Sequence, residues 1–306
     1  MGNERLAKAV QLSESMEQYD GYARNLLSYK ELIAVILKAV GHEFREMSIK
    51  EIKDSIDADP EIETGRIVGG GEEELFPWGA IVRYDIKFTV HIKSYGNLKL
   101  YVNLEAQKSY YPGYDLVTRG VCYAATLLSG QLEKEIESGD YDQLKKVYSI
   151  WICMNAPEKD ANTVTEYRIL PKDVYGRLGE YGRYDLVSVI MIRLPNHEPE
   201  EAAQEPVEKM LAALYTIFKA QKAPEEKCKE LKYRYGIQVS TEFEKEVTTM
   251  CNFSEAILEQ GIEQGIEQGD LRAIRKMLER GYALEEIAQI YEKELIERVL
   301  KETTKV

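Results

Sequence analysis

The sequence is poor in cysteine, histidine and basic side chains, and each shortage argues against a class of function. Its 306 residues include four cysteines, scattered without a C-x-x-C pair, and three histidines that do not cluster. A structural zinc site and a disulfide framework are therefore not expected, and Cys122 and Cys153 are interpreted as buried thiols in a reduced cytoplasm. Lys and Arg number 40 against 53 Asp and Glu, a net charge of −13. That balance is not typical of a nucleic-acid binder, although one groove can be basic on an acidic protein.

Long apolar runs and targeting segments are also missing. The opening MGNERLAKAVQLSESMEQYD lacks the apolar core of a signal peptide. No stretch approaches the roughly 18 apolar residues of a transmembrane helix, so no membrane partner is expected. The glycine run at residues 69–71 is not followed by Lys-Ser or Lys-Thr, which disfavours a phosphate-binding P-loop. We therefore expect a cytoplasmic globular protein.

What the sequence does contain is a strict alternation of apolar and polar residues between Ile81 and Lys108. Even-numbered positions are apolar from Val82 to Ile92 and again from Leu98 to Ala106. Period two predicts two half-buried strands, and the intervening Ser, Gly and Asn residues supply a turn. If Ile92 faces Leu98, every apolar position meets another, and a slip of one residue would move apolar side chains to the polar face.

This register sets two acids, Asp85 and Glu105, opposite each other. Their Cβ atoms would be about 4.5–5.5 Å apart, a spacing at which like charges destabilise a strand pair. A divalent cation between the carboxylates is one remedy, because hard cations take oxygen ligands. Basic neighbours on the same face are the other remedy; they are Arg83, Lys87 and Lys99. The spacing alone leaves both explanations open.

An Asp on one strand and Glu-x-Gln on the next resembles the signature of the PD-(D/E)XK nucleases. Here the residues are Asp85 and Glu105-Ala106-Gln107. The Glu-x-Gln form is similar to that of the recombination-promoting nuclease and transposase family. Further segments of the chain agree with that family in their order: a Tyr- and Arg-containing stretch (110–132), a Tyr-x-x-Leu stretch leading into a strand (141–153) and the repeat ILEQGIEQGIEQG (257–269).

The resemblance implies a restriction-endonuclease-like fold and a metal-dependent DNA endonuclease that acts in the recombination of mobile DNA. It implies Mg²⁺ or Mn²⁺ as the cofactor, held by Asp85, Glu105 and the backbone carbonyl of Ala106. Gln107 lies on the same strand face as Glu105, and its amide can orient a water molecule or a phosphate oxygen. The superfamily has Lys at this position, and Gln lacks its positive charge. A second departure is Arg83-Tyr84, which stands before Asp85 where the signature has Pro.

Three further residues are candidate accessory groups. Glu31 lies on the first long helix, where nucleases of this kind often place another acid, but Ser28 and Glu31 also fit a capping box. Arg119 and Tyr123 are an i,i+4 pair on the helix after the motif. They could reach a phosphate, or they could anchor that helix on the sheet.

A second function fits the same residues: a catalytically silent nuclease-fold protein that serves as a binding or assembly scaffold. Gln107 and the acidic balance favour it, whereas the matched register of Asp85 and Glu105 favours an enzyme. The two hypotheses differ in one measurable property, which is metal-dependent cleavage of DNA.

The remaining periodicity predicts an α/β fold, with a mixed sheet flanked by helices and followed by an α-helical C-terminal region. Helices are expected at 25–44, 48–56 and 114–138, with strands at 147–154, 164–170 and 186–194. The apolar run 147–154 suits a strand that is covered on both faces. A short strand is also expected at 66–68.

Three segments are expected along the chain. A nuclease-like domain at 1–195 should fold without the tail, because an acidic Pro-bounded stretch follows it. Residues 196–252 would be a linker and helices, and residues 253–306 a Gly-Ile-Glu-Gln repeat helix and a small helical unit. The repeated glycines cost a helix about 1 kcal/mol each but permit close packing. The repeat is therefore either a homo-oligomer contact or a solvated linker helix.

Overall fold

The structure is a computed structural model that describes residues 19, 21–57, 73–75, 81–83, 85–93, 98–134, 136, 139–199 and 204–303. It forms two compact units, one of residues 20–249 and a second that contains residues 250–306. The strand expected at 66–68 lies outside the described residues. Among the described helices, none combines the length and the apolar content that crossing a membrane requires.

The first unit is built on a five-stranded mixed sheet, so the α/β architecture expected from the sequence is confirmed. Its strands are β3 (Ile86–Ile92), β4 (Leu98–Gln107), β5 (Val147–Cys153), β6 (Thr163–Arg168) and β7 (Val187–Arg193). Their order is β3-β4-β5-β7-β6. The inner pairs β4–β5 and β5–β7 are parallel, whereas the outer pairs are antiparallel.

The predicted hairpin register is confirmed, since Ile92 pairs with Leu98 and Ile86 pairs with Leu104. Its first strand, however, is not continuous. Residues before Asp85 form β2 (Ile81–Arg83), which pairs with β1 (Glu73–Leu75) in a separate two-stranded sheet. The chain bends at Asp85, so this acid immediately precedes β3 and does not lie within a continuous strand.

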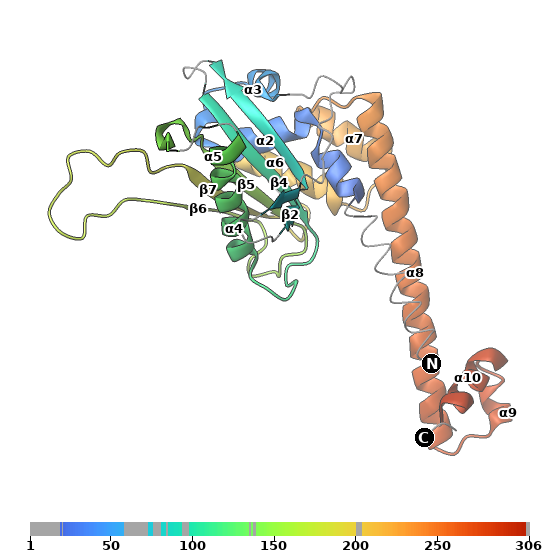
Figure 1. Cartoon of the computed structure of the whole chain (residues 1–306). Coiled ribbons are helices and arrows are strands. Elements are labelled where there is room, and N and C mark those ends of the chain that lie inside the picture. The colour runs from blue at the N-terminus through green and yellow to red at the C-terminus, as the bar shows by residue number, and fades with distance from the viewer. Residues whose placement is uncertain are drawn as a thin grey trace. The chain divides into compact units, whose positions relative to one another are not determined.

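Helices cover both faces of the five-stranded sheet (Figure 1). Helix α4 (Leu116–Ser129) packs on β5 and β7 at one face. The other face is covered by α2 (Lys30–Val40) and α6 (Pro206–Phe218), which contact each other. Every residue of β5 is buried, as the apolar run predicts. Other helical elements described in this unit are a stretch at 21–27, η1 (His42–Phe44), α3 (Ile49–Ser55), α5 (Gln131–Lys134), η3 (Tyr141–Gln143) and α7 (Pro224–Tyr233).

The unit extends past the expected domain boundary at residue 195. Helix α6 contacts α2 and buries apolar side chains, among them Met210, Leu214 and Ile217. These residues belong to the same compact unit as the sheet. By their contacts, the described residues from 196 to 249 therefore group with the sheet.

The C-terminal unit is helical, as expected. Helix α8 (Thr241–Glu279) runs continuously through the Gly-Ile-Glu-Gln repeat and is followed by α9 (Leu284–Ile287) and α10 (Lys293–Thr303). Ile274, Ile287, Ile296 and Val299 form its small core. Gly281 ends the long helix with a positive φ of 82°, a conformation that glycine adopts without steric cost.

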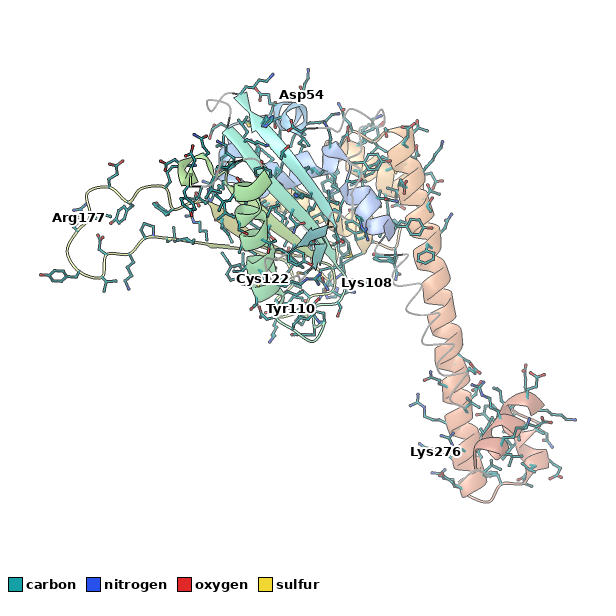
Figure 2. All side chains as sticks on the ribbon, viewed as in Figure 1. Asp54, Lys108, Tyr110, Cys122, Arg177 and Lys276 are labelled. Atoms are coloured by element: carbon teal, nitrogen blue, oxygen red, sulfur yellow. The ribbon has the colours of Figure 1, made fainter. Side chains whose placement is uncertain are left out.

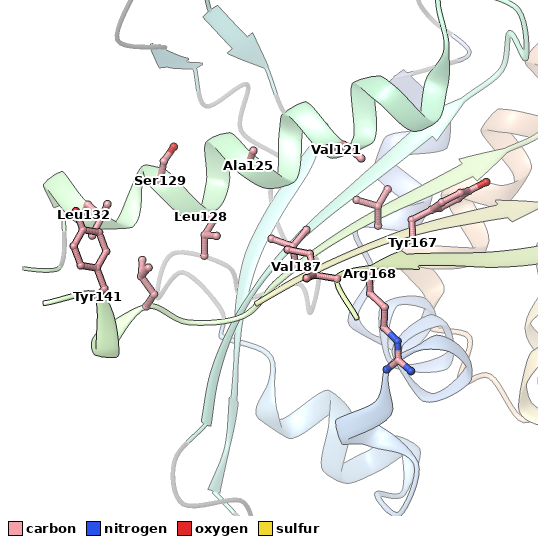
Figure 3. Close-up of a pocket in the computed structure, with 12 residues that line it drawn as sticks. Val121, Ala125, Leu128, Ser129, Leu132, Tyr141, Tyr167, Arg168 and Val187 are labelled. Carbon is pink, nitrogen blue, oxygen red and sulfur yellow. The ribbon is translucent and has the colours of Figure 1, made fainter. Parts of the chain in front are cut away.

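A long loop between β6 and β7 extends away from the sheet, and Figure 2 shows Arg177 at its outer end. Beside the base of this loop lies an apolar groove of about 550 Å³ (Figure 3). The groove lies between α4 and the β6–β7 edge. Residues that line it include Val121, Leu128, Leu132, Tyr141, Ile169 and Val187.

Candidate functional site

The structure brings the carboxylates of Asp85 and Glu105 together at one end of the β3–β4 pair. The backbone N–H of Asp85 donates to Oε1 of Glu105 at 3.1 Å. In return, the backbone N–H of Ala106 donates to Oδ2 of Asp85 at 3.0 Å. The Glu105 carboxylate thus accepts a hydrogen bond from the backbone of Asp85, and the Asp85 carboxylate accepts one from the residue after Glu105. These two bonds hold the side chains as neighbours.

Glu105 is an unusual acid because it is only 4% exposed. Burial, followed by the nearby charge of Asp85, raises the pKa of its carboxyl to about 8. The Asp85 N–H, the Arg119 guanidinium and the Asn103 amide lower this pKa without offsetting the increase. Glu105 therefore holds its proton more tightly than an ordinary glutamate does.

Gln107 occupies the last position of β4, two residues after Glu105 and on the same strand face. It is partly exposed, and its Nε2 donates to the carbonyl oxygen of Ser109 at 2.7 Å. Because β4 and β5 are parallel, this end of β4 lies at the carboxyl edge of the central strands, where α/β proteins usually bind their ligands.

Arg119 and Tyr123 reach this site from α4. The Nη2 of Arg119 donates to the Tyr123 hydroxyl at 2.5 Å, and its Nη1 donates to the Tyr114 hydroxyl. The guanidinium also lies over the rings of Tyr123 and Trp151, at 4.9 and 5.4 Å from their centroids. These contacts and the charge of Glu105 raise the pKa of Arg119 despite its partial burial, so its planar cation is held in place.

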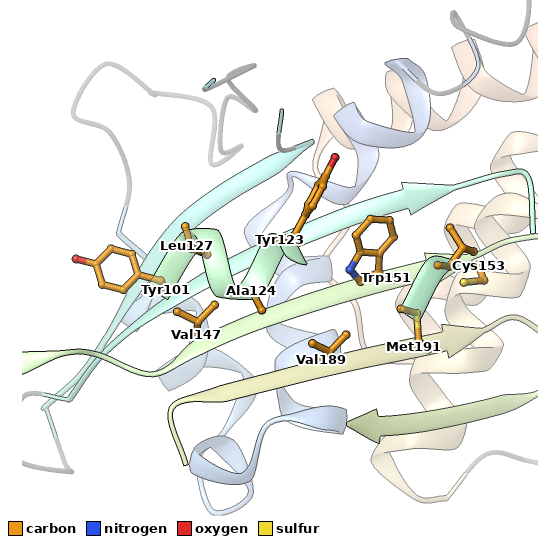
Figure 4. Packing of buried hydrophobic residues seen from close by; sticks show 10 residues of the cluster. Tyr101, Tyr123, Ala124, Leu127, Val147, Trp151, Cys153, Val189 and Met191 are labelled. Carbon is orange, nitrogen blue, oxygen red and sulfur yellow. The ribbon is translucent and has the colours of Figure 1, made fainter. Parts of the chain in front are cut away.

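The close approach of α4 to the sheet depends on Gly120. A Cβ atom at this position would lie 2.7 Å from Val189 Cγ1 and 3.0 Å from Trp151 Nε1. Figure 4 shows Tyr123, Trp151 and Val189 packed between α4 and the strands. Glycine therefore lets the helix settle onto β5 and β7 and carries Arg119 toward Glu105.

A further cation near the pair, Arg24, was not predicted. It lies in the helical stretch 21–27, and its Nε is 3.8 Å from Oδ1 of Asp85. The sequence did contain a signal, because Arg24 is the single basic residue between Lys8 and Lys30. In the structure its neighbours Ala23 and Leu26 are completely buried.

The basic residues expected to neutralise the pair have other surroundings. Lys99 lies over the Tyr101 ring at 4.8 Å, and Lys87 is paired with Asn103 across the hairpin. The side chain of Arg83 lies outside the described residues. Among the described side chains, Arg119 from α4 acts on Glu105, and Arg24 from helix 21–27 lies beside Asp85.

Glu31 does not join the site. Its Oε1 accepts a hydrogen bond from Lys53 Nζ at 2.6 Å. The predicted capping box is wrong as well, since Tyr29 caps α2 without a side-chain bond and Ser28 Oγ donates to the Asn25 carbonyl. Within the described part of the chain, no three His, Cys, Asp or Glu side chains form a metal-binding group. A cation here would depend on two carboxylates and on backbone or amide oxygens.

The expectation that Cys122 and Cys153 are buried thiols can be compared with the structure. Cys153 is buried as expected, but Cys122 is exposed on α4. Tyr110 is engaged at the carboxyl edge of the sheet, where its hydroxyl accepts from Arg193 Nε at 3.0 Å and donates to Asp160 at 3.3 Å.

Comparison of the chain with protein-family models, curated proteins and solved structures gives no match.

Proposed function

We propose that this chain is a metal-dependent DNA endonuclease of the PD-(D/E)XK kind, with a restriction-endonuclease-like fold. The observation that carries the proposal is the Asp85–Glu105 pair, held by reciprocal backbone hydrogen bonds at the carboxyl end of β4. Support also comes from the sheet, in which an antiparallel hairpin bearing the acids is followed by two parallel strands. The resemblance of the Glu-x-Gln motif places the activity in DNA recombination.

The donor set fits a hard divalent cation such as Mg²⁺ or Mn²⁺. Asp85 and Glu105 contribute oxygen ligands, and the Ala106 carbonyl is a third candidate. Burial first, and the nearby charge of Asp85 second, raise the pKa of Glu105, and a bound cation would favour its ionised form. When bound, such an ion offsets phosphate charge and favours formation of hydroxide from water.

The chain's own residues have separate roles around that ion. Glu105 would give up its proton when the cation binds. Gln107 would turn its amide from the Ser109 carbonyl toward a water molecule or a phosphate oxygen. Arg119, fixed by two tyrosine hydroxyls and the Trp151 ring, would hold a phosphate oxygen with its planar guanidinium.

DNA as the substrate requires local positive charge, because the whole chain carries −13. Arg119 and Arg24 supply it close to the acids. The acidic remainder would weaken nonspecific attachment, so we expect binding to depend on these two arginines and to fall with added salt.

The test is nicking of a supercoiled plasmid in Mg²⁺, in Mn²⁺ and in chelator. Wild type should cut only with metal, and Asp85→Asn and Glu105→Gln should each lose at least about a hundredfold in rate. Glu31→Gln is the matched control, since Glu31 pairs with Lys53 away from the site, and it should cut as wild type does. Equal residual cutting by wild type and Asp85→Asn would contradict the proposal.

The scaffold hypothesis stays as the second candidate because of two contacts. The Gln107 amide is satisfied by Ser109, and the Ala106 N–H is satisfied by Asp85. In that case wild type would bind DNA or protein without cutting, and Gln107→Lys would be the variant to examine for a gain of cleavage.

A further inference from the structure

We propose that two copies of this chain form a symmetric dimer in which the loop of each copy lies in the apolar groove of the other. The loop, residues 169–186, is called the arm below. The groove is the one between α4 and the β6–β7 edge. The inference concerns assembly and does not depend on the proposed nuclease activity.

The arm exposes apolar side chains that an ordinary surface loop would not carry. Tyr175 is fully exposed and Val174 is 95% exposed. Three more apolar residues are each over half exposed: Ile169, Leu170 and Leu178. Contiguous apolar surface of this kind usually marks an interaction site.

The arm is held in a defined conformation. Asp173 accepts hydrogen bonds from the Tyr181 hydroxyl at 2.8 Å and from the Leu178 N–H at 3.4 Å. At its base, Arg183 donates to the Leu144 carbonyl at 2.8 Å and to the Asp142 carbonyl. Leu144 also lines the groove, so the arm and the groove keep a fixed relation.

That fixed relation decides which molecule can occupy the groove. The arm points away from the sheet (Figure 1), and of its residues only Ile169, at its base, is among those that line the groove. The groove meanwhile leaves Val121 47% exposed and Tyr141 65% exposed. A second copy supplies an arm of matching chemistry, and a two-fold axis lets both copies exchange arms at once.

Continuity and charge agree with a second copy. Ile169 belongs to both surfaces, and β6 beside it is an edge strand of the sheet, a feature that proteins usually cover. The exposed acids Asp140 and Asp142 flank the groove at Tyr141, while the arm carries Lys172 and Arg177. Because the arm also holds Asp173 and Glu180, its mixed charge suits a protein partner better than a nucleic acid.

The exposed side chains can be compared with what a dimer needs. A standard interface buries about 800 Å² on each partner, and one aromatic side chain buries about 150–250 Å². Tyr175 on the arm is fully exposed and Tyr141 in the groove is 65% exposed. With two arms and two grooves, every copy contributes both of these aromatic side chains to the interface.

The first test is sedimentation of the full chain over a range of concentrations. Wild type should dimerise, and Val174→Ser/Tyr175→Ser should raise the dimer dissociation constant at least about tenfold. Val121→Ser should also raise the dissociation constant, because Val121 lines the groove. Tyr233→Ser is the matched control, because Tyr233 is 79% exposed on α7 and should leave the constant unchanged.

The second test locates the contact, in a Cys122→Ser background that removes the exposed native thiol. Tyr175→Cys and Val121→Cys chains, mixed and treated with a short bismaleimide, should give a cross-linked pair that neither chain gives alone. The proposal is overturned if wild type is a monomer throughout, or if the arm variant still dimerises, which would place the contact in the C-terminal helices. Cross-linking within one chain carrying both cysteines at high dilution would also overturn it, because the arm would then reach its own groove.

Discussion

Replacing Glu105 with Gln should stabilise the metal-free protein, and the gain should increase with pH. Burial and the Asp85 charge raise the pKa of this carboxyl from 4.5 to about 8. The folded protein therefore holds a proton that the unfolded chain releases once the pH exceeds the unfolded pKa. Stability is full below that value and is lost as the pH rises toward the folded pKa.

The size of the effect follows from this window. Each pH unit between the two pKa values lowers the free energy of unfolding by about 1.4 kcal/mol. Between pH 6 and pH 8, wild type should thus lose about 2 kcal/mol that Glu105→Gln retains. Comparing the slopes of the two proteins removes any constant packing difference caused by the amide.

The assay is urea unfolding in chelator at several pH values, followed by the fluorescence of the buried Trp151. Glu225→Gln, at an exposed acid, should keep the wild-type slope. Adding Mg²⁺ or Mn²⁺ should stabilise wild type more at pH 8 than at pH 6, because the cation competes with the proton, and Glu105→Gln should respond little. Parallel profiles for wild type and Glu105→Gln would refute the account of a buried, repelled acid.

Two further predictions concern the scaffold of the site. Gly120→Ala should destabilise the protein by about 1–3 kcal/mol, less the helix-propensity gain, because the new Cβ meets Val189 and Trp151. Gly269→Ala is its control in urea unfolding; nothing lies within 4 Å of that Cβ among the described residues, so it should gain stability. A chain ending at residue 200 should fail to fold cooperatively by circular dichroism, whereas one ending at residue 249 should fold. The buried α6 side chains, such as Leu214, each contribute about 1.5–3 kcal/mol, and folding of the shorter chain would contradict this.

The hairpin could be predicted because its alternation of apolar and polar residues disfavours every other pairing register. Apolar residues at alternate positions leave one register in which β3 and β4 share a buried face, and that register is observed. The break at Asp85 could not be predicted from the same pattern, since the alternation continues through Val82. What ends the strand there is pairing of β2 with β1 in another sheet, a long-range choice that local periodicity does not contain.

Local capping signals succeeded only where no tertiary contact competed. Ser48 and Glu51 form a capping box at the start of α3, the helix expected at 48–56. The equivalent pattern at Ser28 and Glu31 fails because Lys53, from the next helix, takes the Glu31 carboxylate. Ser28 instead donates to a carbonyl of the preceding helical stretch. The same short motif therefore has two outcomes, and the nearby cation decides between them.

The charges around the acid pair show the same limit more clearly. Sequence reasoning found Asp85 and Glu105 because both lie on one hairpin, and it looked for their cations on that hairpin. Two cations that act on the pair come from elsewhere: Arg119 from α4, which Gly120 lets approach the sheet, and Arg24 from the helical stretch 21–27. Burial first, and the Asp85 charge second, still raise the pKa of Glu105 to about 8 despite the charge of Arg119. The positive charge supplied by Arg119 therefore does not offset the cost of a buried carboxylate beside Asp85, which is the physical reason to expect that a divalent cation completes the site.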